Sequence, residues 1–419
     1  MAKPKLALIP AAQGTKFYSV LPSDGTGDFD FTRGSVATRI NAQGLIENVA
    51  SGQSRLDYPM IDGVQKGCPH HILEPARTQL VQYSEDFSSG WVLDDATIIS
   101  NNAISPDGAL NATLLKGNTN SSRHNLVTSG QASSTGSFSV FVKAKELKYV
   151  QIASANTVQQ YVNFDLSNGI IGTVGSSFSN AKLEYYGNGW YRCIVVSANQ
   201  FNGFYVSLVS GLNATWLESW VMPNNTDGLY IYGAQLEVGS YPTSYIPNNG
   251  NAAGVTRSAE TANGAGNSTT FNDSEGVLMA EIANSETTTG SYLGICNGGS
   301  SERLIIGNEG GLLRVYTDVF VSGSIQSANK DFNKIAVKYN SSNTSIYYNG
   351  FLIKSINVSA NLSGINELKF TSGGSAQNFY GKAKQIQYFD SALDSQQLEQ
   401  LTSWQSFRDM ANGQLYTIE

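Results

Sequence analysis

The sequence predicts an all-β protein with two antiparallel β-sandwich domains after an extended N-terminal arm, and with a short C-terminal helix. Charged residues make up only 14% of the 419 residues, whereas glycine alone occurs 42 times. Few charges and many turn-forming residues favour short strands joined by loops over long helices. Alternating segments of strand length recur along most of the chain, and a chain of this length needs more than one core.

A central segment, GLYIYGAQLEVGSYPTSYIP at residues 228–247, divides the chain. The side chains of its first half alternate in character, which is typical of a strand whose two faces have different surroundings. Pro242 and Pro247 cannot donate to a sheet ladder, so the strand ends before them. We expect the strand to close a domain over residues 80–250, and the proline-containing strap to lead into a second domain over residues 251–419.

Strand signals come at regular spacing in the predicted domain over residues 80–250. Segments 161–174 and 183–196 read as hairpins, with Asn-Gly and Gly-Asn-Gly at their turns. Seven or more short strands without a long helix pattern predict a β-sandwich or jelly roll. The domain over residues 251–419 shows a similar series of strands, with a tight hairpin predicted at the Asn-Gly pair of YYNGF.

One segment near the C-terminus, from Asp394 to about Asp409, predicts a helix. Asp394 can cap it together with Gln397 three residues later. The apolar residues that recur every three positions are Leu398, Leu401, Trp404 and Phe407. We expect this apolar side to pack on the preceding sandwich, and contact with another subunit is the alternative.

The first 79 residues contain few periodic segments and many turn residues. Two short candidate strands lie at Phe29–Phe31 and Ala37–Ile40, with Gly34 between them. A segment this long without regular structure is unusual inside a compact domain. We therefore expect residues 1–79 to form an extended attachment arm or a strap wrapped over a neighbour.

Several motifs follow one another in a fixed order: FTRGSVATRINAQGLIE, SRLDY, ILEPARTQLVQYSEDFSSGW, NGWYRC and YIYGAQLE with YPTSYIP. Together they resemble structural proteins of tailed phages, of the tail-fibre, head-fibre or decoration type. The resemblance implies a carbohydrate-binding-like jelly roll for residues 80–250. The strand pattern of residues 251–419, with its hairpin and closing helix, resembles a concanavalin A-like (laminin G-like) lectin sandwich.

The resemblance also implies a location and a role. It implies a virion protein made in the host cytoplasm, with other virion proteins as partners and a homo-oligomeric assembly. Its role would be non-catalytic adhesion of lectin-like domains to glycans of the host surface. Two alternatives stay open. One is a purely architectural capsid or tail component that binds no sugar, since fold does not dictate function, and the other is a capsule-degrading depolymerase.

Motifs for catalysis and cofactors are missing from the sequence. It contains no nucleophile elbow, Walker loop, HExxH or CxxC, and only three histidines. The run from Glu281 to Glu286 lacks the middle aspartate of glucanases, which need carboxyl groups at a defined separation. We expect no enzyme activity and no cofactor. Metal binding is unknown, and loop carboxylates at Asp107, Asp227 and Asp273 leave a structural calcium open although each fits an ordinary turn.

Charge and cysteine content exclude other classes. The net charge is −7 and the basic residues are scattered, which argues against nucleic-acid binding. No segment approaches the length and apolarity of a membrane span, so we expect no membrane insertion. The three cysteines, Cys68, Cys193 and Cys296, are far apart and odd in number, which predicts reduced thiols.

Aromatic residues are the remaining candidates for function, because pyranose rings stack on exposed Trp and Tyr while amides and carboxylates bind the hydroxyls. Trp216 and Trp220 lie four residues apart among polar residues, and on a strand they would share one side. Tyr348 flanks the Asn-Gly tip, where it or its neighbour should face solvent. We expect Trp216, Trp220 and Tyr348 to bind glycan, and the alternative for the tryptophans is a place in the sandwich core.

Overall fold

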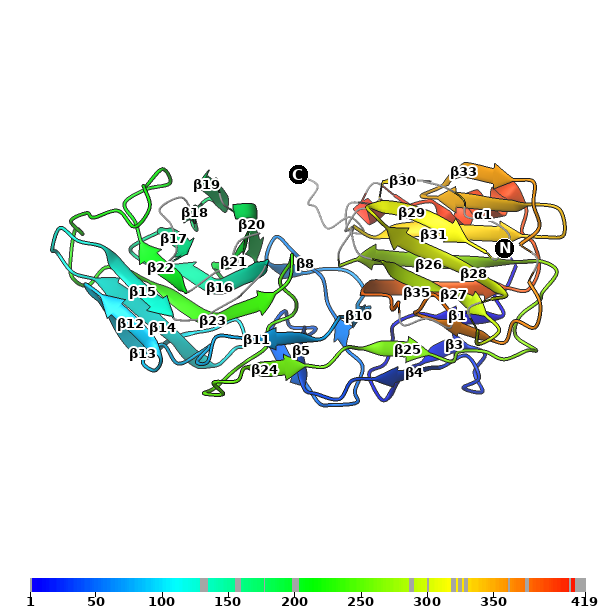
Figure 1. Cartoon of the computed structure of the whole chain (residues 1–419), viewed down its shortest axis with the longest axis horizontal. Helices are drawn as coiled ribbons and strands as arrows, with labels where there is room; N and C mark the ends of the chain where they lie inside the picture. The colour runs from blue at the N-terminus through cyan, green and yellow to red at the C-terminus, as the bar shows by residue number, and fades with distance from the viewer. Residues whose placement is uncertain are drawn as a thin grey trace.

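The structure is a computed structural model, and it describes residues 2–128, 135–154, 160–176, 178–197, 203–285, 290–299, 301–317, 322, 326–327, 331–360, 362–373, 377–406 and 408–410. Antiparallel sheets confirm the all-β class. Figure 1 shows two lobes side by side, joined by a middle region. Residues 91–238 build one lobe, here called the first sandwich. Residues 276–389 and strands from the start of the chain build the other, called the second sandwich.

Two six-stranded sheets make up the first sandwich. Sheet I runs in the order β12 (Trp91–Asp94), β15 (His124–Thr128), β22 (Phe204–Leu208), β17 (Tyr149–Ser154), β18 (Tyr161–Asp165) and β19 (Ile170–Val174). Sheet II runs in the order β13 (Ala96–Ile104), β14 (Leu110–Gly117), β23 (Gly228–Val238), β16 (Gly136–Ala144), β21 (Trp190–Ser197) and β20 (Phe178–Tyr185). Side chains from both sheets interdigitate in one core, for example Leu126 and Val206 of sheet I with Phe138 and Val195 of sheet II.

Both hairpins predicted in this domain are present. β18 pairs with β19 around Gly169, which has φ of 65°, and β20 pairs with β21 around Asn188, which has φ of 52°. These left-handed conformations are the ones that Gly and Asn tolerate best. Short-range turn chemistry therefore predicts these pairings correctly.

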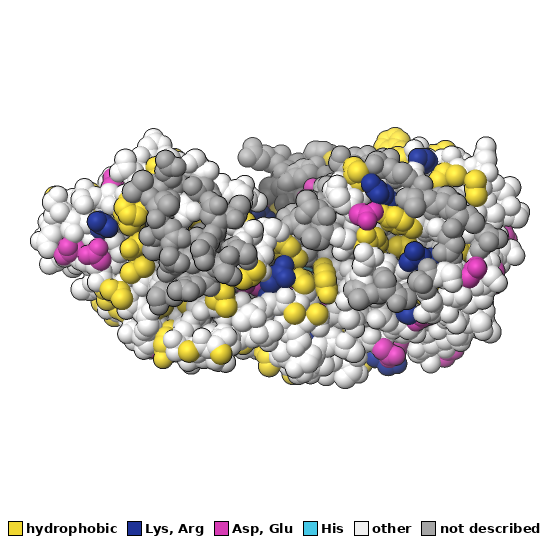
Figure 2. Space-filling model, in the orientation of Figure 1, with side chains coloured by type: hydrophobic (Ala, Val, Ile, Leu, Met, Phe, Trp, Pro, Cys, Tyr) yellow, Lys and Arg dark blue, Asp and Glu magenta, His cyan; other side chains and the backbone are white. Residues whose placement is uncertain are grey.

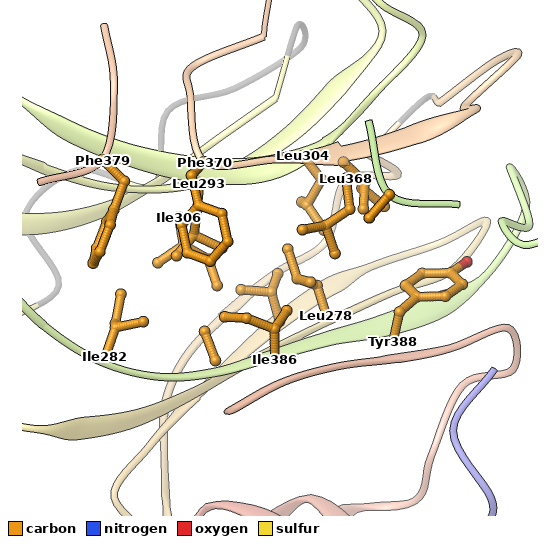
Figure 3. Packing of buried hydrophobic residues seen from close by; sticks show 14 of the residues in the cluster. Leu278, Ile282, Leu293, Leu304, Ile306, Leu368, Phe370, Phe379, Ile386 and Tyr388 are labelled. Atoms are coloured by element: carbon orange, nitrogen blue, oxygen red, sulfur yellow. The ribbon is translucent and has the colours of Figure 1, made fainter. Parts of the chain in front are cut away.

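A nine-stranded sheet faces a five-stranded sheet in the second sandwich. The main path of the larger sheet is β3 (Ser19–Leu21), β1 (Leu6–Leu8), β35 (Gly381–Phe389), β26 (Gly276–Asn284), β31 (Asn333–Tyr339), β32 (Thr344–Tyr348) and β33 (Phe351–Ile356), and β10 (His70–Leu73) and β7 (Leu56–Asp57) are attached through β35. The smaller sheet is β30 (Gln326–Ser327), β29 (Leu312–Tyr316), β28 (Arg303–Glu309), β27 (Ser291–Cys296) and β34 (Glu367–Lys369). Figure 3 shows Leu278, Ile386 and Tyr388 of the larger sheet pointing toward Leu293 and Leu304 of the smaller one.

The extended form expected for residues 1–79 is wrong, because these residues fold into the sheets. β1 pairs with β35 in register Leu6↔Tyr388, and Leu6 and Leu8 are fully buried in the core of the second sandwich. The remaining short pairs are β2 (Lys16–Phe17) and β4 (Phe29–Thr32) with β25 (Thr261–Asn263), β5 (Ala37–Ile40) with β6 (Ile46–Val49), β8 (Met60–Ile61) with β9 (Val64–Gln65), and β11 (Arg77–Gln79) with β24 (Val255–Arg257). The backbone of Gly63 lies against that of Gly187, so the same segment also contacts the first sandwich. Its partners are distant in the sequence, which is why local periodicity is weak there.

The predicted helix is present as α1 (Ser395–Thr402), and Asp394 with Gln397 forms the expected capping box. The helix is shorter than expected, because the backbone adopts an extended conformation at Ser403 and the helix ends there. Leu398 packs against buried residues of the larger sheet, which confirms the expected contact with the sandwich. Phe407 lies outside the described residues. Within the described part of the chain, no helix is long and apolar enough to cross a membrane.

Candidate functional site

The two predicted tryptophans lie in a loop between β22 and β23, not on one side of a strand. Leu217, between them, adopts φ of 43°, a left-handed conformation that interrupts an extended backbone. The Trp220 ring is half-buried against the core, and its indole N–H donates to the Leu208 carbonyl oxygen at 3.1 Å. The half-buried Trp216 ring lies under the guanidinium group of Arg123, 5.8 Å from the ring centroid.

Tyr348 lies on β32 of the second sandwich, so it belongs to a different lobe from the tryptophans. Its side chain is half-buried, and its hydroxyl group donates to Asn333 Oδ1 at 2.6 Å. The Asn-Gly tip forms as predicted, with φ of 48° at Asn349 and 94° at Gly350. The three predicted glycan-binding residues therefore do not form one site.

A cleft between the two sandwiches is a stronger candidate. Its volume is about 450 Å³, within the range of small-molecule sites. Figure 2 shows basic and hydrophobic side chains beside each other in the middle of the molecule, between the lobes. The residues that line the cleft on β20, β21 and β16 of the first sandwich are Asn180, Lys182, Glu184, Arg192, Ile194, Val196 and Phe141, together with Tyr186.

The opposite wall and the floor come from the second sandwich and from the middle region. The ends of β26 and β35 supply Asn284, Ser285 and Lys382, and residues 240–245 of the strap cross the floor. Asp57 of β7 lies beside Lys382. The cleft thus brings together parts of the chain more than 300 positions apart, which the sequence offers no local signal to predict.

Four charged side chains of the cleft lining form two ion pairs. Lys182 Nζ lies 2.7 Å from Glu184 Oε1, and Lys382 Nζ lies 3.9 Å from Asp57 Oδ2. Burial alone would raise the pKa of Glu184, but Lys182 and Arg192 outweigh burial and hold this pKa below its ordinary value. The pKa of Asp57 is also lowered: burial opposes the shift, and the hydrogen bond from His70 and the charge of Lys382 outweigh it. Both carboxylates are therefore ionised near neutral pH.

Beneath the cleft lies a buried ionic cluster, here called the hub, of Arg33, Arg55, Glu74, Arg257 and Glu260. Arg55 donates from Nε to Glu260 at 2.8 Å and from Nη2 to Glu74 at 2.8 Å. Arg33 and Arg257 complete the cluster, at 2.8 Å from Glu260 and 2.9 Å from Glu74 respectively. All five side chains are almost completely buried. Such groups are tolerated only when each charge is paired and hydrogen-bonded, so the hub fixes the cleft floor in one geometry.

Three residues of the hub, and Ser244 beside it, come from the ordered motifs of the sequence. Arg33 comes from FTRGSVATRI, Arg55 from SRLDY and Glu74 from ILEPARTQ. Ser244 of YPTSYIP accepts from Arg55 Nη1 at 2.7 Å and donates to Glu74 Oε2 at 2.6 Å. The sequence alone does not bring these motifs together, because their charged residues pair only in the folded chain.

No group of three or more potential metal-ligating side chains occurs among the described residues. Asp107 accepts from the Ala109 backbone N–H at 2.7 Å, and Asp273 accepts from the Gly364 and Ile365 backbones at 2.7 and 3.0 Å. Asp107 therefore acts as the turn former that the sequence predicts, whereas Asp273 bonds to a loop 91 and 92 positions later in the chain. The three cysteines are free.

No protein-family model matches this chain, and no curated protein matches it. Among solved structures, the CBM40 domain of a Ruminococcus gnavus sialidase bound to α2,3-sialyllactose is 16% identical, with a TM-score of 0.28, over 33% of this chain and 87% of that one. A candidate carbohydrate-binding protein from Bacteroides ovatus is 13% identical, with a TM-score of 0.26, over 73% of this chain and 79% of that one. Domains LG4-5 of mouse laminin α1 are 9% identical, with a TM-score of 0.22, over 79% and 96%. Every TM-score is below 0.5, so these likenesses do not decide the function of this chain.

Proposed function

We propose that this chain is a non-catalytic, glycan-binding structural protein of a tailed-phage virion, and that the cleft between its sandwiches holds the glycan. The observation that carries the proposal is an open cleft of about 450 Å³ on a floor fixed by the hub. A preorganised site loses less free energy on binding than one that must first become ordered.

The chemistry of the cleft suits a saccharide. The amides of Asn180 and Asn284 and the hydroxyl group of Ser285 can donate to and accept from sugar hydroxyls. The Lys182 side chain is 66% exposed, so its ammonium group has donors free for a ligand. Tyr186 and Tyr241 supply aromatic surface beside these polar groups. This combination of a few polar groups with apolar and aromatic walls is typical of ligand clefts.

Lowered carboxylate pKa values support a non-catalytic role. Glycoside hydrolysis needs one carboxyl group that stays protonated to act as the general acid. The pKa of Asp57, Glu74 and Glu184, the three carboxylates of the cleft lining, is lowered in each case, so none of them retains a proton near neutral pH.

A depolymerase is the alternative that one observation favours. Tyr232 donates its hydroxyl proton toward both Glu85 at 3.2 Å and Asp107 at 3.0 Å. Burial raises the pKa of Glu85, whereas the Ser105 and Ala109 hydrogen bonds lower the pKa of Asp107 against the effect of burial. Opposite shifts are the pattern of an acid and base pair, but neither residue lines the cleft. A reducing-end assay on host capsule polysaccharide, with Glu85→Gln as the matched variant, tests this alternative.

The virion role and the homo-oligomer rest on the sequence resemblance. Exposed aliphatic side chains on the edge strands β12 and β13 and beside them support an assembly, because Val92 is 65% exposed, Ile104 55% and Leu110 59%. Imaging of the protein in its particle tests the location. A stable monomer in sedimentation under virion-like salt would contradict the assembly.

A glycan array tests binding in the cleft. We expect the parent protein to retain at least one glycan, and a Lys182→Ala, Asn284→Ala variant to bind that glycan at least about tenfold more weakly, since a lost hydrogen bond to a charged group costs roughly 1.5–3 kcal/mol. Lys116→Ala is the matched control, because Lys116 lies on β14 outside the cleft lining. Absence of binding by the parent protein would favour the purely architectural alternative.

A further inference from the structure

A row of polar side chains crosses the outer face of sheet I, away from the cleft. The row is Asn125 on β15, Ser207 on β22, Gln151 on β17 and Asn163 on β18, each the direct cross-strand partner of the next. Their chain neighbours Leu126, Val206, Ile152 and Val162 point into the core, so strand alternation places the row on the opposite face. All four polar side chains are fully buried.

The loop that carries Trp216 covers this row and bonds to half of it. Gln151 donates to the Thr215 carbonyl oxygen at 2.9 Å and accepts from the Leu217 backbone N–H at 2.7 Å. Asn163 donates to the carbonyl oxygens of Leu212 at 3.2 Å and Ala214 at 2.7 Å. Main-chain groups of the loop thus fill hydrogen-bonding positions that hydroxyl groups of a ligand could fill equally well.

The side chains of Asn125 and Ser207, the other half of the row, have no hydrogen-bond partner among the described residues. Asn125 has neither an acceptor for Nδ2 nor a donor for Oδ1, and Ser207 Oγ and Trp216 Nε1 are buried without a partner as well. Buried polar groups are nearly always hydrogen-bonded, and each one left unpaired costs roughly 1–3 kcal/mol. Two of these residues are direct cross-strand partners and the third lies in the loop above the row, so together they indicate a binding site.

We propose that the row is a second, closed binding site for an uncharged, hydroxyl-rich ligand of the pyranose class, and that residues 212–217 form its lid. The four side chains carry amides and a hydroxyl group but no formal charge, which suits a neutral polyol. Tyr161 and Tyr205 occupy the next row of the same face and are half-buried, so they offer aromatic surface at its border. This site does not depend on the cleft.

Two features of the lid set its position. Leu217 and Ala214 are 4% and 6% exposed and anchor it by burial. Leu217 also holds φ of 43°, a conformation that is strained for a leucine and that persists only when surrounding contacts enforce it. A lid that must open before binding lowers the apparent affinity by the fraction of molecules that are open. A substitution that weakens the anchoring of the lid should therefore increase the apparent affinity for the ligand.

The experiment follows the Trp216 indole N–H by NMR while methyl glucoside, methyl galactoside and methyl mannoside are added at millimolar concentration. A Trp216→Phe variant assigns the signal. We expect one of these sugars to shift the signal and to speed hydrogen exchange of amides in residues 212–217. We expect Leu217→Ala to bind that sugar about tenfold more tightly although it lowers the stability of the protein.

A second variant tests whether the unpaired polar groups bind a ligand or only lower the stability of the protein. Asn125→Leu with Ser207→Ala removes three of the unpaired atoms, so we expect an unchanged or higher melting temperature together with loss of the sugar-induced shift. Lys182→Ala in the cleft should leave the shift intact, which distinguishes this site from the cleft. No shift with any of the three sugars, in the parent protein and in Leu217→Ala alike, would overturn the proposal.

Discussion

His70 and His71 illustrate how single residues of the middle region respond to their surroundings. Both side chains are buried on β10, where His70 Nε2 lies 3.0 Å from Asp57 and the His71 ring stacks on Phe17 with 3.7 Å between centroids. Burial lowers the pKa of His70 to about 4, with Lys382 adding to the shift and Asp57 opposing it. Burial also lowers the pKa of His71 to about 3. Both rings are therefore neutral in the folded protein near neutral pH.

These shifts predict acid sensitivity. Between pH 6.5 and about 4 the unfolded chain binds protons that the folded chain does not bind. The free energy of unfolding should therefore fall as the pH falls through this window, by up to about 1.4 kcal/mol per pH unit for each histidine. Urea unfolding at several pH values measures the slope. His71→Phe keeps a ring against Phe17 but does not titrate, so its slope should be shallower, and an unchanged slope would contradict the prediction.

The residues of the candidate sites were only partly predictable. Trp216 lies beside the polar row, but Trp220 uses its N–H within the fold and Tyr348 belongs to the other lobe. A signal for the row exists in the sequence, because YVQIAS and YVNFD each place an amide between two apolar residues of one strand, and HNLVT places one directly before Leu126. Whether such an amide is paired depends on the loop above it, and this loop has no periodic pattern.

At the level of elements, turn chemistry and long-range pairing differ in how well they can be predicted. The hairpins at Gly169, Asn188 and Asn349 form because a few adjacent residues favour left-handed conformations. β1, by contrast, is three residues long and joins the larger sheet through its pairing with β35, which lies far away in the sequence. Local sequence cannot specify such a pairing, so the N-terminal segment reads as an arm although it folds into a sheet.

The burial of β1 gives a prediction for this element. Leu8→Ala should destabilise the second sandwich by about 2–5 kcal/mol, because Leu8 is fully buried in its core. Ile9→Ala is a matched control one residue away, since Ile9 is 46% exposed, and it should cost less than about 1 kcal/mol. Denaturant unfolding of both variants measures the difference. Equal losses would show that β1 contributes no core packing.

For the whole molecule, the hub is the point at which distant parts of the chain meet. It joins residues before β11, the strap near Ser244 and the segment after β24. Burial lowers the pKa of Arg55, but Glu260 and Glu74 outweigh burial and raise it. Arg55 therefore keeps its charge over the accessible pH range, and the members of the cluster depend on each other for compensation of their charges.

Removing one member of the hub should expose this dependence. Arg55→Met removes the guanidinium group that pairs with both Glu260 and Glu74. We therefore expect a loss of about 3–5 kcal/mol in the free energy of unfolding. Lys16→Met breaks an exposed ion pair with Asp30 and should cost less than about 1 kcal/mol. Urea unfolding followed by tryptophan fluorescence compares the two variants. Similar losses in the free energy of unfolding would show that the buried ion pairs of the hub contribute no more to stability than an exposed pair.

The pairing of β1 with β35 also affects how the protein is made. Tyr388, the partner of Leu6, is synthesised 382 positions after it, which at ordinary translation speeds is roughly 20–80 s later. During that time β1 and β10 lack β35, the strand that joins them to the larger sheet, whereas the first sandwich can already close. Completion of the second sandwich must therefore await the synthesis of β35, and copies growing side by side on one messenger could exchange the strands that wait for it.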